Sequence, residues 1–170
     1  MAALNPHGSD GGLLGNEEAE EIAPAVAEAQ ERGIAAVGPV PADVVFHRAI
    51  QGDYDVVLAM FHDQGHIPVK VYGFEDSITA NLGLPFVRTS VDHGTAFDIT
   101  GQGIASHTSM LESIRLAVAL ARGNGLADFC RLGNSPLPAG NKALAAVSIE
   151  NDGIEQQLVV VNPAPGCNWR

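Results

Sequence analysis

The sequence predicts an α/β layered fold, because short apolar strands are separated by amphipathic helical segments. Residues 55–61 (DVVLAMF) are a continuous apolar run of strand length, which is typical of strands covered on both faces, as in parallel sheets. Residues 84–90 (LPFVRTS) are a second short strand. Residues 109–123 are the clearest helix, with apolar positions at helical intervals and Ser109 and Glu112 at capping-box spacing. Strands alternating with helices pack as α/β layers.

The remaining segments predict further helices and a late hairpin. Residues 17–32 predict a helix with glutamates in its first turns, in which Pro24 marks either a kink or a fresh helix start. Residues 38–50 predict a loop leading into a short helix. Beyond residue 125 the sequence pattern changes. Residues 134–142 predict a loop, and residues 145–161 predict a β-hairpin that turns at Asn-Asp-Gly.

Composition and charge narrow the class of protein. A chain of 170 residues with 46% hydrophobic and 17% charged residues predicts one globular domain. The net charge of −11 with nine Lys and Arg argues against nucleic acid and anionic membranes as partners. Without a signal-peptide pattern or a membrane-length apolar run, we expect a soluble, cytoplasmic protein. Cys130 and Cys167 lack metal-type spacing, and a disulfide between them stays open.

The stretch FHDQGHIPVK (61–70) follows the first predicted strand, where α/β proteins place their ligands. His62 and His66 are four residues apart, which on a helix would put both on one face for a metal. Gly65 and Pro68 argue instead for a loop, so we do not expect a helical metal clip.

Six histidines raise the question of a metal site, because imidazole is a common metal ligand. Any single histidine is more often structural or simply exposed. His7, His62 and His93 lie in glycine-rich loop contexts, where function concentrates, whereas His47 and His107 are best explained as structural.

Two isolated cations indicate an anionic ligand. Lys70 and Arg88 are the only Lys or Arg residues between residues 49 and 114, and both lie near ends of predicted strands. Such cations can recognise a phosphate or carboxylate. Salt bridges to nearby acidic residues (Glu75, Asp76 or Asp92) are an equally good explanation of either cation alone. From the residues only, the site is predicted to bind a metal and an anionic small molecule.

Five motifs in order resemble one family. They are LNPHGSDGGLLGNEE, GPVPAD, AMFHDQGHIPVK, LGLPFVRTS and SVDHGTAFDITGQG. Together they resemble the 4-hydroxythreonine-4-phosphate dehydrogenase family, including the related 4-phospho-threonate and 4-phospho-erythronate dehydrogenases, over residues 3–122. The resemblance implies the C-terminal portion of a layered fold similar to the isocitrate and isopropylmalate dehydrogenases, incomplete in this chain.

The resemblance also implies an activity. The family oxidises 4-phosphooxy-threonine with NAD and a divalent metal (Zn, Mg or Co), and decarboxylates the product, in pyridoxal phosphate biosynthesis. The active site forms in a homodimer. HGTAFDITG looks like an adenosine-binding loop.

The family's residue roles carry over by motif. The resemblance implies that His7 and His62 are metal ligands and that Asp43 is a catalytic residue. It implies that Lys70, Thr79 and Arg88 bind substrate. The cofactor-binding residues that it implies are His93, Gly94, Ala96 and Asp98. Thr79 stands where an asparagine commonly contacts substrate, which keeps 4-phospho-threonate and 4-phospho-erythronate open as substrates.

Not all of the family pattern is present. A third metal histidine and a His-Thr pair belong to a front section that we expect to lie outside this chain. Residues 1–125 are thus expected to be the C-terminal portion of a dehydrogenase, and 126–170 a divergent tail of unknown function. The alternatives are a truncated, non-catalytic module of the family and, less favoured because of the adenosine loop, a metal-dependent hydrolase.

Overall fold

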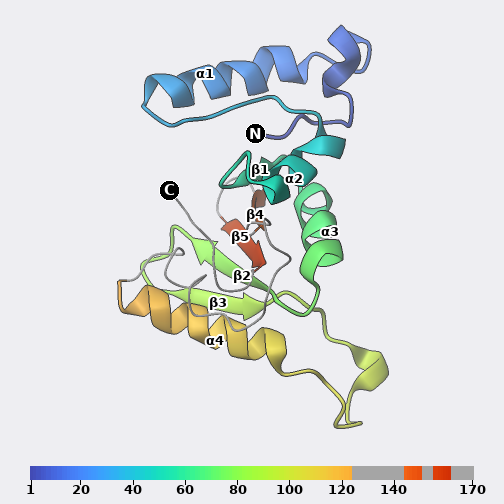
Figure 1. Cartoon of the computed structure of the whole chain (residues 1–170), viewed down its shortest axis with the longest axis vertical. Coiled ribbons are helices and arrows are strands. Elements are labelled where there is room, and N and C mark those ends of the chain that lie inside the picture. Colours follow the sequence, from blue (N-terminus) through green and yellow to red (C-terminus); the bar gives the residue numbers. More distant parts are fainter. Residues whose placement is uncertain (124–143, 151–154, 162–170) are drawn as a thin grey trace.

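The computed structural model describes residues 1–123, 144–150 and 155–161 (Figure 1). Helices and strands are mixed along the chain, as the α/β prediction requires. In order, the elements are η1 (Gly8–Gly12), η2 (Glu18–Ile22), α1 (Ala23–Glu31), α2 (Ala42–Gln51), β1 (Val57–Ala59), α3 (His62–Gly73), β2 (Ser77–Leu82), β3 (Arg88–Val91), η3 (Phe97–Ile99), α4 (Thr108–Ala121), β4 (Leu144–Glu150) and β5 (Glu155–Val161).

The described strands form one five-stranded mixed sheet in the order β1-β4-β5-β2-β3. β1 pairs with β4 in parallel, and the other neighbours are antiparallel. The predicted hairpin strands are therefore confirmed, and they lie between β1 and β2 rather than at the sheet edge. The hairpin's turn, 151–154, lies outside the described residues.

Two apolar contacts hold the helices on the sheet. The first is a buried cluster around β1, α2 and α3, made of Ala2, Val40, Val45, Phe46, Ala49, Val57, Ala59 and Val69. The second lies where α4 packs along β2 and β3, with Ile78 and Leu116 both fully buried. Figure 1 shows α4 running beside β3, and α3 on the other side of β2. This arrangement brings the polar face of α3 toward β2 and β3.

The first residues of the chain run extended beside β1. Ala2 N donates to Leu58 O at 2.9 Å, and Ala3 N donates to Val40 O at 2.7 Å. The Gln64 side chain joins this segment to α3, because its Nε2 donates to Ala3 O at 2.8 Å and its Oε1 accepts from Met60 N at 2.7 Å. The start of α3 is thus fixed by side-chain bonds to the strand before it.

The prediction of a loop at 61–70 is wrong, because α3 begins at His62 and contains both Gly65 and Pro68. Pro68 lacks the N–H that would bond to the carbonyl four residues back, and glycine lowers helix propensity. Tertiary packing outweighs both costs, because the helix buries its residues Gly65, His66 and Val69. Local propensity was overridden by burial.

The predicted strand boundaries need two corrections. The 55–61 strand is shorter, at Val57–Ala59, and the 84–90 strand begins only at Arg88 and ends at Val91. The prediction also missed β2 (Ser77–Leu82), which is almost entirely buried. Its mixture of polar and apolar residues (SITANL) lacks a clear alternation, since its polar side chains are buried in contacts made by the tertiary fold.

The helix termini settle two further predictions. Pro24 lies in the first turn of α1, which continues the short π-helix η2 without a break, because Ile22 and Ala23 both have right-handed helical φ and ψ angles. The capping box at Ser109 and Glu112 is wrong, because α4 is capped at His107 without a side-chain bond. Ser109 instead donates through Oγ to Ser77 O at 2.8 Å, and Glu112 pairs with Arg115. These hydroxyl and carboxylate groups bind tertiary and helical partners.

Several predictions fall outside the described residues: the loop at 134–142, the pairing of Cys130 with Cys167, and most of the 126–170 tail. In the part of the chain that the structure describes, no helix is both long and apolar enough to cross a membrane.

Candidate functional site

A small polar cavity lies between α3 and the β2–β3 pair, with a volume of about 220 Å³. Four of the predicted site residues line it, from three different elements. Its lining residues are His62, His66 and Lys70 of α3, Thr79 of β2, Arg88, Ser90 and Val91 of β3, and Asp92 directly after β3.

Secondary-structure periodicity explains why these residues meet. His62, His66 and Lys70 follow one another at intervals of four on α3, and residues so spaced lie on one helix face. Arg88, Ser90 and Asp92 alternate along and just beyond β3, so they share one face of the sheet. The antiparallel register places Thr79 opposite Ser90.

Asp92 is the electrostatic centre of this cavity. Its side chain is 4% exposed. Its Oδ2 accepts from Ser77 Oγ at 3.0 Å, and its Oδ1 accepts a longer bond from Thr79 Oγ1 at 3.4 Å. Burial by itself raises the pKa of Asp92, but the adjacent His66 ring, the Lys70 charge and the Ser77 hydroxyl together outweigh it, so the pKa lies below its ordinary value. Asp92 is therefore a charged carboxylate at neutral pH.

The two cations of the cavity have different partners. Lys70 stabilises the charge of Asp92, so one of the salt-bridge partners considered from the sequence does act on it. Arg88 donates through Nη1 to the amide oxygen of Asn81, a neutral acceptor. Because an amide does not cancel the guanidinium charge, the cavity keeps a cation suited to an anionic ligand.

The two histidines of α3 stack on each other. Their ring centroids are 3.9 Å apart and their planes are inclined by 14°. A metal ion lies close to the ring plane of each imidazole that binds it, so two stacked and nearly parallel rings do not chelate one ion. The loop on which the sequence-based expectation rested is absent, since both histidines lie on one face of the helix α3.

The metal site implied by the resemblance is incomplete among the described residues. His62 Nδ1 lies 2.8 Å from Asp63 Oδ1, and His7 Nδ1 lies 3.1 Å from Asp10 Oδ2. His62 lines the small cavity, and His7 does not. Across residues 1–123, no group of three or more His, Cys, Asp or Glu side chains is placed to hold a metal ion. The residues described here do not by themselves fit a divalent metal.

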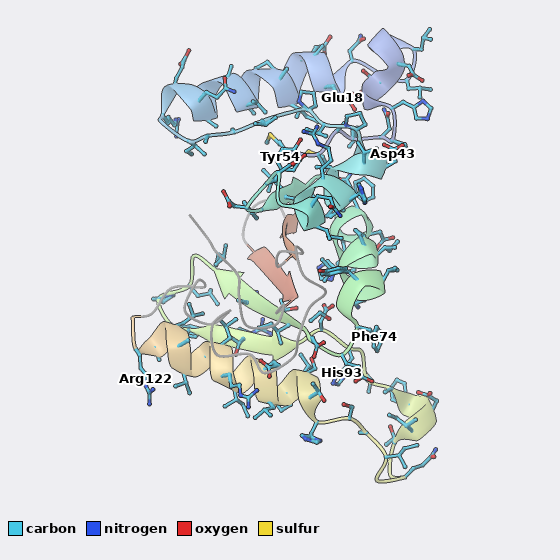
Figure 2. All side chains as sticks on the ribbon, in the orientation of Figure 1. Glu18, Asp43, Tyr54, Phe74, His93 and Arg122 are labelled. Carbon is cyan, nitrogen blue, oxygen red and sulfur yellow. The ribbon has the colours of Figure 1, made fainter. Side chains whose placement is uncertain are left out.

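A larger cavity of about 600 Å³ lies beside the loop that follows β3. It gathers all four predicted cofactor-binding residues, His93, Gly94, Ala96 and Asp98, against the end of α3 and the start of α4. Figure 2 shows His93 and Phe74 on this side of the molecule. The volume is in the range of small-molecule and cofactor sites.

The comparison with protein families decides the relationship. The model described as "Pyridoxal phosphate biosynthetic protein PdxA" matches residues 1–117. The chain belongs to this family.

Members of the PdxA family with this sequence pattern include named dehydrogenases. A 4-hydroxythreonine-4-phosphate dehydrogenase of Geobacter metallireducens is 55% identical over 125 residues, 74% of this chain and 37% of the relative. A D-threonate 4-phosphate dehydrogenase of Cupriavidus necator is 53% identical over 122 residues, 71% of this chain and 37% of the relative.

A solved structure supports the fold of the same portion. The crystal structure of a 4-hydroxythreonine-4-phosphate dehydrogenase from Klebsiella pneumoniae has a TM-score of 0.61 at 52% identity, covering 71% of this chain and 36% of that one. This PdxA-family chain therefore spans little more than a third of the length of these relatives.

Two predicted residues of the PdxA-family pattern lie outside both cavities. Asp43 is exposed in the first turn of α2, and His7 is exposed beside Asp10 (Figure 2 labels Asp43). Sequence reasoning in turn did not assign His66 or Asp92 to the site. The spacing could have indicated both residues, because His66 lies four residues before Lys70 and Asp92 lies four residues after Arg88. The first spacing indicates a shared face only once residues 62–73 are known to be helical.

Proposed function

We propose that this chain carries substrate- and cofactor-binding residues of an NAD- and metal-dependent dehydrogenase that oxidises and decarboxylates 4-phosphooxy-threonine to an amino-ketone phosphate in pyridoxal phosphate biosynthesis. The observation that carries the proposal is the gathering of Lys70, Thr79 and Arg88 in one cavity. The larger cavity begins at His93, the residue next to Asp92 of the small one, so substrate and cofactor would meet there.

The residues of the small cavity would bind and orient the substrate. Lys70 and Arg88 are suited to its phosphate or carboxylate groups. The hydroxyls of Thr79 and Ser90 are suited to its hydroxyl or amino groups. Fixing both anionic ends would hold the carbon to be oxidised toward the larger cavity. NAD bound there would accept the hydride.

A second substrate class is favoured by Thr79. The position commonly holds an asparagine in the resembling family, and Thr has a shorter side chain with a single hydroxyl. Together with relatives named D-threonate 4-phosphate dehydrogenase, this supports 4-phospho-threonate or 4-phospho-erythronate as the alternative substrate.

Three features of the proposal concern the whole protein. We propose that its complete fold is layered like the isocitrate and isopropylmalate dehydrogenases, and that it works as a cytoplasmic homodimer. The metal would need ligands beyond those gathered in the described residues. A chain lacking those ligands would be a non-catalytic module that keeps its binding residues.

The test is NADH formation by the purified 170-residue chain. NAD is supplied with 4-phosphooxy-threonine or 4-phospho-threonate, and Zn, Mg or Co is added in turn. Turnover of one substrate that is lost in Arg88→Ala supports the dehydrogenase and selects the substrate. Arg122→Ala is the matched control, because Arg122 is exposed at the end of α4 and lines neither cavity. Absence of turnover in a protein that is folded by circular dichroism supports the non-catalytic module.

A further inference from the structure

His66 is a buried imidazole at the small cavity to which the family resemblance assigns no role. Its side chain is 6% exposed, and its Nδ1 lies 3.4 Å from Asp92 Oδ1. Both ring nitrogens are buried without a hydrogen-bond partner among the described residues, although Nδ1 lies beside the Asp92 carboxylate. A buried polar atom without a partner is costly, and such atoms often mark the place where a ligand or water binds.

Asp92 occupies one edge of the His66 ring. Nδ1 lies 3.4 Å from its Oδ1, and the carboxylate already accepts hydrogen bonds from Ser77 and Thr79. Nε2 stands at the far side of the ring from Nδ1, so it is the nitrogen left for a ligand.

We propose that the unpartnered Nε2 of His66 forms a hydrogen bond with a hydroxyl of the ligand whose anion binds Lys70 and Arg88. His66 is then the residue that distinguishes a phosphorylated hydroxy acid from a simple anion. This inference rests on the proposed function, since it takes the ligand to be a phosphorylated hydroxy acid.

The geometry of the cavity supports this division of roles. Lys70 lies one helical turn beyond His66 on the same face of α3, and Arg88 lines the same cavity from β3. The His62 ring covers one face of His66 by stacking, which leaves the in-plane edge of the ring for hydrogen bonds. A ligand anchored by its anion at the cations thus has its hydroxyls near the imidazole.

Hydroxyl recognition is tested by calorimetric titration with 4-phospho-threonate and with inorganic phosphate. His66→Asn keeps a polar atom near the Nδ1 position but removes the one at Nε2, whereas His66→Gln keeps a polar atom near Nε2. We expect His66→Asn to weaken 4-phospho-threonate binding about tenfold, the size of one hydrogen bond, with phosphate binding unchanged. His66→Gln should recover part of the loss.

The outcomes separate this inference from the proposed function. Equal weakening of both ligands by His66→Asn means a structural role only and overturns the inference, as does a wild-type chain that binds neither ligand. Selective weakening in a chain that forms no NADH supports the inference while the catalytic proposal fails.

Discussion

Replacing Asp92 by Asn tests the buried charge at the centre of the small cavity. The substitution keeps the size of the side chain but removes its negative charge. It weakens contacts with Ser77 at 3.0 Å, Thr79 at 3.4 Å and His66 at 3.4 Å, and it removes the attraction of Lys70. Hydrogen bonds to charged groups contribute about 1.5–3 kcal/mol each, and only the Ser77 bond is short. Because Asn keeps one acceptor oxygen, we expect a loss of about 2–3 kcal/mol in the free energy of unfolding.

The effect of Asp92→Asn should also depend on pH with a definite sign. The pKa of Asp92 is lowered in the folded protein, so the unfolded chain binds more protons as the pH falls below the ordinary Asp value of 3.8. The stability contributed by the charge is therefore fully present above that value and is lost as the pH falls through the folded pKa. The difference between wild type and Asp92→Asn should stay constant from neutral pH down to about pH 5 and then shrink.

Urea unfolding followed by circular dichroism measures both effects. Asp98→Asn is the matched control, because Asp98 is exposed in η3, and the free energy of unfolding of this variant should change by less than about 0.5 kcal/mol. The reasoning is refuted if Asp92→Asn is as stable as this control at neutral pH. It is also refuted if the difference from wild type grows in acid.

Three other changes probe the rest of the molecule. Leu116→Ala empties a fully buried position of α4 and should cost about 2–5 kcal/mol in urea unfolding, whereas Val118→Ala on the exposed side should cost far less. Lys70→Ala should weaken inorganic phosphate binding about tenfold by calorimetry, with Arg122→Ala as the unaffected control. The pKa of Asp76 is raised by burial and by two nearby glutamates, so wild type loses stability as the pH rises through it. Asp76→Asn should therefore raise the melting temperature at neutral pH, by the equivalent of about 0.5 kcal/mol.

The helices show how far local sequence signals reach. The α4 segment was predicted from its apolar spacing. The helical segment 17–32, which η2 and α1 form, was predicted from its acidic start and from Gly33 after its end, whose φ of +83° is a conformation that glycine adopts easily. These signals act within one or two turns. They did not predict the α3 helix, because Gly65 and Pro68 locally disfavour a helix. Burial against the sheet decides the structure there.

The strands show the opposite limit. β1 was found from its apolar run, but β2 was not, because Ser77 and Thr79 are buried through their bonds to Asp92, a residue on a different segment. A sequence window contains no information about such a partner. For the same reason Asp92 itself was considered only as a counter-ion for a cation.

Residue identity alone determined the chemistry available to this protein: few cations in an acidic chain, of which Lys70 and Arg88 stand isolated, and ordered motifs that place it in its family. Tertiary structure decided which of these groups meet. It put His62, His66 and Lys70 on one helical face opposite Thr79 and Arg88, and it left His7 and Asp43 outside that cavity. The physical reason is that side-chain type is a local property, whereas proximity depends on strand register and on the helix face that burial selects.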